Sequence, residues 1–303
     1  MKQRIIATAI AVLCFIAAIG IILYPAVSSY VNEKYRSEIH TEYELQLNLV
    51  DDTELERVRE LAVAYNEAIT PGATMNEAYS QEAILAASED YDAQLNLTET
   101  GVMGYVEIPR LDIYLPIYHG TGTDSLDRGV GHLLGSSLPV GGSSTHSILT
   151  GHCGMANQRL FTDLPQMVVG DVFYLHVLNE VLAYQVDEIN TVLPYDTTHL
   201  GVTSGEDYCT LITCTPVGIN THRLLVRGTR IPYEKAVTVQ EEVQSQQPEQ
   251  NSNWENQYML GIWLGILALL IAGLVCLLYR RFHKMPKRRK GGRYVRKKTW
   301  KKW

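Results

Sequence analysis

Three residues of this chain, Cys214, His152 and Arg223, could together perform acyl transfer. Cys214 ends a run that alternates like a β-strand, Arg223 begins another such run nine residues later, and His152 follows a third. A thiolate is a strong nucleophile, a histidine transfers protons near neutral pH, and an arginine keeps its positive charge. These residue types predict a reaction through a thioester, with a fixed cation available for the oxyanion.

The neighbouring cysteines must be separated from Cys214. Alternation in the run 208–214 places Cys209 on the opposite face, so these two thiols cannot line one pocket. Cys153, directly after His152, is a rival nucleophile, although nothing around it supplies a second positive charge. No pair of histidines or cysteines has the spacing of a metal site, so we expect neither a metal nor another cofactor.

Two stretches are apolar and free of charge over a length that could cross a membrane: residues 5–24 and residues 259–279. A helix of about 20 residues spans the ~30 Å hydrocarbon core of a bilayer. The first stretch is longer than the apolar core of a signal peptide, and no convincing cleavage site precedes Pro25. We therefore expect an uncleaved anchor, with a cleaved signal peptide as the alternative.

Charge is distributed unevenly along the chain. All 33 acidic residues lie between Glu33 and Glu255, a segment with only 11 basic residues and a formal net charge of −22. Residues 280–303 hold 13 Lys and Arg and no acid. A basic block beside an apolar run indicates a cytoplasmic end rather than a nucleic-acid site. We expect a two-pass cell-membrane protein with both termini in the cytoplasm and residues 28–257 outside.

The external part divides into a helical and a β-rich region. Apolar residues recur at helical intervals over 28–96, with a break at Thr70-Pro-Gly. From 101 to 231, short β-like runs are separated by turn residues, and a tight hairpin turn is expected at Asn179-Glu180. This texture predicts a compact β-barrel. The predicted strands are 102–108, 113–118, 146–150, 172–178, 181–189, 208–214 and 223–228.

The predicted organisation has six parts. They are a cytoplasmic N-terminus with its anchor (1–27), a helical spacer (28–100), a catalytic β-barrel (101–235), a polar linker (236–257), a transmembrane helix (258–279) and a basic cytoplasmic tail (280–303).

The signature TLITC at 210–214, with His152 upstream and Arg223 downstream, closely resembles the sortases, cysteine transpeptidases of the Gram-positive cell surface. The sequence GINTHRLLVRG at 218–228, the helical preface and the second apolar run resemble the class C, pilus-building branch. Further matches to the family lie at 104–109, 115–120, 129–132, 137–141, 145–152, 160–164 and 213–216.

The resemblance implies an eight-stranded sortase barrel and a defined reaction. Cys214 would attack the Thr–Gly carbonyl of an LPXTG-like sorting signal and form a thioacyl enzyme, with His152 and Arg223 in the roles given above. A lysine of the next pilin would resolve it as an isopeptide bond, so pilins with sorting signals and acceptor lysines are the implied partners. Thr213 matches the motif threonine, and it either shapes the substrate groove or is simply a β-branched strand residue.

Class C sortases often carry a lid built on an Asp-Pro-aromatic or Asp-Ala-aromatic tripeptide, and the best local match is Glu77-Ala78-Tyr79. The acid could engage Arg223 while the ring of Tyr79 covers Cys214. Glu77 is longer than Asp by a methylene and no Pro stiffens the turn, so an ordinary helical turn is the alternative.

Cys153 is a second departure from the family pattern, since this branch more often has an arginine there. A Cys153–Cys214 disulfide would inactivate the enzyme, and we therefore hypothesise that activity is sensitive to oxidation. Equal activity of the oxidised and reduced proteins would contradict this hypothesis.

Other functions remain open from the sequence alone. A housekeeping or class D sortase would use a peptidoglycan amine as its acceptor, and a cysteine peptidase would use water. A non-catalytic scaffold that gathers pilins would tolerate loss of Cys214.

Overall fold

The computed structural model of this chain describes residues 2–69, 90–97, 100–155 and 158–246, and the isolated residues 263, 265, 266 and 273. The chain divides into two units, Met1–Pro248 and Glu249–Trp303. The helices of the first unit are α1 (Lys2–Leu49), α2 (Asp52–Glu67), α5 (Thr123–Leu126) and α6 (Tyr233–Gln246). Its strands are β1 (Val102–Ile108), β2 (Ile113–His119), β3 (Val130–His132), β4 (Thr145–Thr150), β5 (Val172–Val177), β6 (Glu180–Val192), β7 (Asp207–Thr215) and β8 (His222–Ile231).

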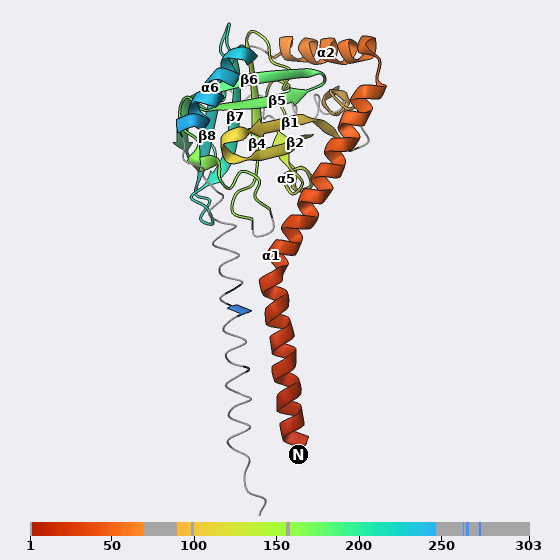
Figure 1. The fold of residues 1–303 in the computed structure, drawn as a ribbon. Helices are drawn as coiled ribbons and strands as arrows, with labels where there is room; N and C mark the ends of the chain where they lie inside the picture. Colours follow the sequence, from red (N-terminus) through yellow and green to blue (C-terminus); the bar gives the residue numbers. More distant parts are fainter. Residues whose placement is uncertain are drawn as a thin grey trace, which may run out of the picture. The chain divides into compact units, whose positions relative to one another are not determined.

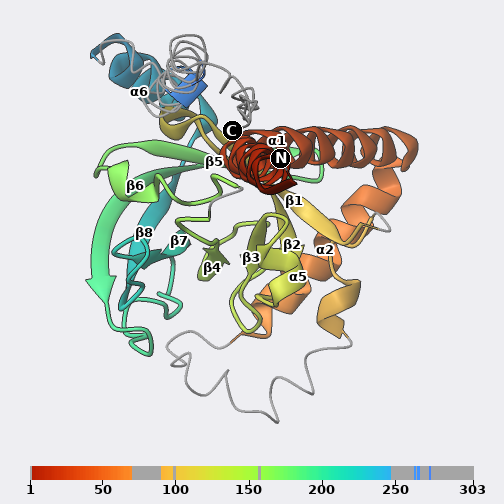
Figure 2. The ribbon, with the colours of Figure 1, turned by 90° about the horizontal axis from the view of Figure 1, so that it is seen from below.

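The eight strands in the described residues close into a barrel in the order β1-β2-β3-β4-β7-β8-β6-β5 (Figure 1). The pairs β2–β3 and β4–β7 are parallel, and the other neighbours are antiparallel. Closure leaves no row of unpaired backbone groups along a sheet edge. Figure 2 shows β3, β4, β7 and β8 following one another around the barrel. The compact β-barrel that the strand pattern predicts, with the eight strands that the family resemblance implies, is thus confirmed.

Side-chain alternation in β7 separates two apolar layers. Cys209 and Leu211 point into the main core, together with Phe173. Ile212 faces the other way and packs against Leu200 in a second, smaller cluster outside the barrel. The alternation that the sequence predicts for this run is therefore present, and it decides which cysteine is accessible.

The C-terminal part of α1 packs on the barrel through Tyr43, which is only 1% exposed. The Tyr43 hydroxyl donates to the carbonyl of Met103 (3.3 Å) and accepts from the backbone N–H of Leu178 (3.1 Å). Its ring meets Tyr105 edge-on, with centroids 5.5 Å apart. Burial raises the pKa of Tyr43 to about 12. A single hydroxyl thus joins α1, β1 and the β5–β6 turn.

That turn lies one residue earlier than predicted. Val177 pairs with Glu180, so Leu178 and Asn179 form the turn. Leu178 has φ 52°, which is unfavourable for a branched residue. Burial of its side chain and the bond from its N–H to Tyr43 favour the turn at this position.

Helix α6 occupies residues for which the sequence predicts a polar linker beginning at 236. Ala236 is fully buried and packs with Val172, Tyr174, Ala183 and Ile231 of the barrel wall. This contact holds the first turns of α6 on β5 and β6 despite their polar composition.

Helix α1 continues without a break through the predicted boundary between residues 27 and 28. Among the described residues, no helix combines the length and the apolar character needed to cross a membrane. The two predicted spans gain no support from this finding, and most of residues 259–279 lie outside the described part of the chain.

Candidate active site

Three neighbouring strands bring Cys214, His152 and Arg223 to one end of the barrel. In the antiparallel β7–β8 pair, Cys214 lies directly opposite Arg223. In the parallel β4–β7 pair, Thr150 lies opposite Ile212, and the N–H of the next residue, Gly151, donates to the Ile212 carbonyl (3.0 Å). The chain therefore reaches His152 at the level of Cys214. Residues far apart in the sequence meet because β7 is the middle strand of the three.

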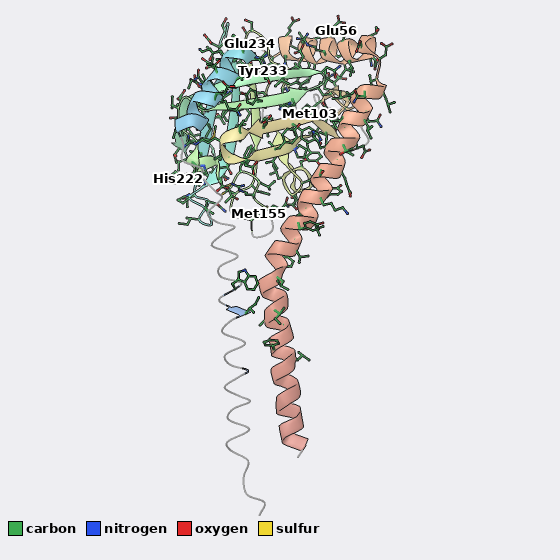
Figure 3. The ribbon with its side chains drawn as sticks, in the orientation of Figure 1. Glu56, Met103, Met155, His222, Tyr233 and Glu234 are labelled. Carbon is green, nitrogen blue, oxygen red and sulfur yellow. The ribbon has the colours of Figure 1, made fainter. Side chains whose placement is uncertain are left out.

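Two residues labelled in Figure 3 show where this end of the barrel lies. His222, just before Arg223, and Met155, three residues beyond His152, lie on the side of the barrel away from Glu56 and Tyr233 (Figure 3).

The two cysteines of β7 have opposite environments. Cys214 is partly exposed at the strand end, whereas Cys209 is fully buried. Burial raises the pKa of the Cys209 thiol well above its usual value, which keeps it protonated and unreactive. Cys214 is therefore the β7 thiol that a substrate can reach.

Thr213 points into the barrel and is only 1% exposed. Its hydroxyl donates to the carbonyl of Gly151 (2.8 Å), the residue before His152. Gly151 itself leaves no room for a side chain, because an added Cβ would lie 2.7 Å from the Phe161 ring. These contacts fix the path by which β4 delivers His152. They give Thr213 a positioning role in the strand interior.

The imidazole of His152 lies close to a carboxylate that the sequence does not reveal. Its Nε2 is 3.8 Å from Oδ1 of Asp127, and both side chains are partly exposed, 38% and 49%. Asp127 follows helix α5, and its carbonyl accepts a 2.5 Å hydrogen bond from the side-chain amide of Gln158. No spacing rule connects Asp127 to His152, because only the packing of two loops makes them neighbours.

Cys153 contacts the nucleophile's own backbone. Its thiol donates to the carbonyl of Cys214 (2.8 Å) and lies 3.8 Å from the side-chain oxygen of Asn220. Burial raises the pKa of the Cys153 thiol, partly offset by a hydrogen bond with Thr213 and by the charge of Arg223. A protonated thiol is a poor nucleophile toward a peptide carbonyl, so these contacts weigh against Cys153 as the group that attacks the substrate.

Arg223 is held by backbone acceptors just before and at the start of β8. Its guanidinium donates to the carbonyls of Asn220 (3.2 Å) and His222 (3.0 Å). Within the described residues no carboxylate lies within 4 Å of it. A guanidinium has five N–H donors, so several remain for an oxyanion or a substrate carbonyl.

Two other histidines are buried and structural. Burial lowers the pKa of both His132 and His146 to about 4, so both are neutral near pH 7. His146 bonds the hydroxyl of Thr210 (2.7 Å) and the carbonyl of Gly201 (2.9 Å), which ties the β6–β7 loop to the sheet. Neither residue is available for proton transfer with a substrate.

Two predictions from the sequence concern a lid over the site and the absence of a metal ion. Glu77 and Tyr79, the predicted lid residues, lie outside the described residues, so their approach to Arg223 and Cys214 stays a prediction. In the part of the chain that is described, no group of three or more His, Cys, Asp or Glu is placed to hold a metal ion.

Comparisons with known proteins agree on one family. A family model described as "Sortase domain" matches residues 106–231. The crystal structure of sortase C1 from Streptococcus agalactiae is 45% identical, with a TM-score of 0.59, and the match covers 63% of this chain and 97% of that one. A structure of sortase C from Streptococcus pneumoniae, described as informative on catalysis and pilin substrate specificity, is 45% identical with a TM-score of 0.56, covering 65% and 97%.

Curated relatives give the same result over a shorter region. Sortase A of Staphylococcus aureus (strain NCTC 8325 / PS 47) is 33% identical over 146 residues, which is 46% of this chain and 69% of that protein. The chain matches only 53% of the length of the Streptococcus agalactiae sortase A, at 30% identity.

Proposed function

Because this chain belongs to the sortase family of cysteine transpeptidases, and to its class C branch, we propose that it cleaves LPXTG-like sorting signals and transfers the acyl group to an amine. The proposal rests mainly on how three residues are arranged. Cys214 lies opposite Arg223 across β7 and β8, while β4 delivers His152 beside them.

Each residue has a defined part in the proposed reaction. The Cys214 thiolate attacks the Thr–Gly carbonyl, and Arg223 stabilises the oxyanion of the tetrahedral intermediate. Protonated His152 gives its proton to the departing glycine amine, which leaves a thioacyl enzyme. His152 then accepts a proton from the incoming amine as the thioester is resolved. Thr213 and Asp127 hold the strand end and the imidazole in place.

A lysine of a pilin subunit is the acceptor that we propose. The support is the likeness to the sortases C of two streptococci, one of which was described with regard to pilin substrate specificity. A peptidoglycan amine is the acceptor in the alternative, a housekeeping or class D activity, and water is the acceptor in a peptidase.

We also propose that residues 5–24 and 259–279 anchor the enzyme in the cell membrane, with the barrel outside and both termini in the cytoplasm. The apolar runs and the basic residues on their outer flanks support this topology. An engineered cysteine near residue 300 tests this topology. A membrane-impermeant maleimide should not label it in intact cells, and labelling would place the tail outside.

The predicted lid is likewise a proposal. A carboxylate from Glu77 would pair with Arg223, for which the described residues offer no acidic partner, and Tyr79 would cover Cys214. Glu77→Gln should then speed labelling of Cys214 by a thiol reagent several-fold, whereas Glu67→Gln, at the end of α2, should leave the labelling rate unchanged. Equal labelling of all three proteins would contradict the lid.

Product analysis tests the proposed function directly. The full chain in detergent is mixed with a sorting-signal peptide and a lysine-bearing pilin domain, and adducts and products are identified by mass spectrometry. We expect a thioacyl adduct on Cys214 and an isopeptide-linked product. Cys214→Ala should abolish both, while Cys209→Ala, at the buried thiol of the same strand, should retain both.

Three outcomes would overturn parts of the proposal. Free threonine carboxylate as the product despite excess amine would indicate a peptidase. Transfer to a peptidoglycan amine but not to the pilin would indicate the anchoring activity. Polymer formation by Cys214→Ala would indicate a scaffold.

A further inference from the structure

A second thiol sits at the nucleophile's strand end, and the proposed reaction does not use it. Cys153 lies three residues beyond Thr150 on the β4 side, and Cys214 two residues beyond Ile212 on β7. Thr150 and Ile212 are opposite residues of adjacent strands, which lie about 4.8 Å apart, so the short segments that lead to the two cysteines begin within the Cα separation of roughly 4.4–6.8 Å that a disulfide bridges. The Cys153 sulfur already contacts the Cys214 carbonyl at 2.8 Å.

The surroundings permit the two sulfurs to meet. Both residues are only partly buried; Cys214 is the second-last residue of β7, and Cys153 lies beyond the end of β4. Gly154 follows with φ +70°, a conformation that glycine adopts without strain, so the chain turns directly after Cys153. Cys209, the remaining thiol of the barrel, is sealed in the core and faces the other way.

We propose that Cys153 is a resolving thiol, which captures an oxidised Cys214 as a reversible intramolecular disulfide. This inference rests on the proposed role of Cys214 as the reactive nucleophile. Hydrogen peroxide and similar hydroperoxides would oxidise this pair of thiols reversibly. The disulfide protects the nucleophile and switches the enzyme off while it persists.

The chemistry proceeds in two balanced steps. The Cys214 thiolate attacks one oxygen of hydrogen peroxide, the O–O bond breaks, and a sulfenic acid forms as hydroxide leaves and takes up a proton. The Cys153 sulfur then attacks the sulfenic sulfur, the S–O bond breaks, and water leaves with the thiol proton. Overall, two thiols are oxidised and one peroxide is reduced to two waters. A dithiol reductant reverses the result by thiol–disulfide exchange.

Lack of a resolving thiol would change the end product. A sulfenic acid with no partner reacts with further peroxide to a sulfinic acid, which ordinary thiols do not reduce. Cys153 therefore converts a terminal oxidation into a recoverable one.

Peptide mapping of the full chain in detergent tests this directly. The protein is treated with hydrogen peroxide, digested without reductant and analysed by mass spectrometry, and transpeptidation is measured before and after dithiothreitol. We expect a Cys153–Cys214 cross-linked peptide whose mass is lower by two hydrogens than the sum of the two peptides. After dithiothreitol, activity should recover to near its untreated level. A wild-type map with sulfinic acid at Cys214 and no cross-link would overturn the proposal without any variant.

Two variants sharpen the result, each compared with its own untreated activity. Cys153→Ala should gain two oxygens at Cys214 and stay inactive after dithiothreitol. Cys209→Ala should behave as the wild type. Equal recovery of Cys153→Ala and wild type would contradict the resolving role.

The untreated wild type is also mixed with the sorting-signal peptide alone. An adduct on Cys214 without a cross-link after peroxide removes the resolving role and leaves the proposed function standing. Absence of the adduct removes the proposed function, and the peptide map still decides independently whether Cys153 pairs with Cys214.

Discussion

At the scale of single residues, the site combines positions that are fixed to very different degrees. Cys214 and Arg223 are opposite residues of one antiparallel ladder, so the backbone itself sets their separation. His152 lies past the end of β4 and depends on contacts from neighbouring loops, including the carboxylate of Asp127. Substitutions that change loop contacts should therefore affect the histidine more than the other two residues.

Arg223→Lys should lower kcat/KM for a sorting-signal peptide about 10²-fold, the usual effect of losing one oxyanion donor. Lysine keeps the charge but not the planar fork of donors. Arg227→Lys is the matched control, because Arg227 lies on the same face of β8 and pairs instead with Asp187 and Glu188. Steady-state kinetics on both variants make the comparison, and equal losses would contradict a specific role for Arg223.

Asp127→Asn should lower kcat/KM about two- to fivefold, the range expected for a partly exposed ion pair. The amide keeps the shape of the carboxylate but removes the charge near His152. Asp124→Asn, in the first turn of the short helix that precedes Asp127, should leave kcat/KM unchanged. Equal kcat/KM values for the two variants would show that Asp127 does not act on His152.

Sequence reasoning finds functional residues that adjoin a β-like run and misses those that only loop packing brings to the site. Cys214, Arg223 and His152 are identifiable because each adjoins a run with a period of two. Asp127 has no such signal, since its distance to His152 is created by tertiary packing. The buried position of Thr213 follows from alternation, but its bond to Gly151 depends on the parallel pairing of β4 and β7.

At the scale of elements, the site depends on how β4 and α1 are attached to the rest of the barrel. The parallel pair β4–β7 ends at the Thr213–Gly151 hydrogen bond, and α1 is joined to the barrel through Tyr43. Each attachment is a buried polar contact, for which the loss of one partner is costly.

Thr213→Val should destabilise the protein by about 1–3 kcal/mol, because it leaves the Gly151 carbonyl without its partner at nearly constant volume. It should also lower kcat, since the path to His152 loosens. Thr213→Ser keeps the hydroxyl and should preserve more of both quantities. Urea unfolding and single-turnover kinetics report the two effects, and a Val variant as stable and active as Ser would refute the positioning role.

Tyr43→Phe should cost about 1–3 kcal/mol of unfolding free energy, because the backbone groups of Met103 and Leu178 both lose their partner. Tyr30→Phe, on an exposed position of α1, should change stability by only a few tenths. Urea unfolding of both variants tests the contrast. Similar values for the two would mean that α1 does not stabilise the barrel through this hydroxyl.

Predictability from sequence also varies among the elements. Long alternating strands such as β1 and β7 are recognisable from period alone. β3 has three residues, too few to show any period, and exists because its neighbours β2 and β4 provide partners. The start of α6 is missed for a related reason, since its helical state depends on burying Ala236 against the barrel.

At the scale of the whole molecule, acid should destabilise the barrel. The pKa of His132 and of His146 is about 4 in the folded protein, against 6.5 when exposed. The unfolded chain thus binds up to two more protons between these values, so stability rises with pH across that window and falls on acidification. Asp207, whose pKa burial raises above 3.8, acts in the opposite sense with a single proton.

We therefore expect Tm, measured by circular dichroism, to fall between pH 7 and pH 4.5. His146→Gln retains hydrogen-bonding groups but does not titrate, so its Tm should fall less steeply. A Tm that is constant or rises toward pH 4.5 would contradict the buried neutral state of the two histidines.

The central position of β7 in the triad has a consequence for the timing of activity during synthesis. Cys214 acquires its partners only after β4, which lies some 60 residues earlier, and β8, which follows it, have both paired with β7. The pairing of β4 with β7 is long-range and forms late in folding, because loop closure must precede it. A chain that has emerged only as far as the β7–β8 loop carries the thiol but lacks the arginine. The reactive centre therefore appears only when the barrel closes, so catalytic activity is itself a measure of complete folding.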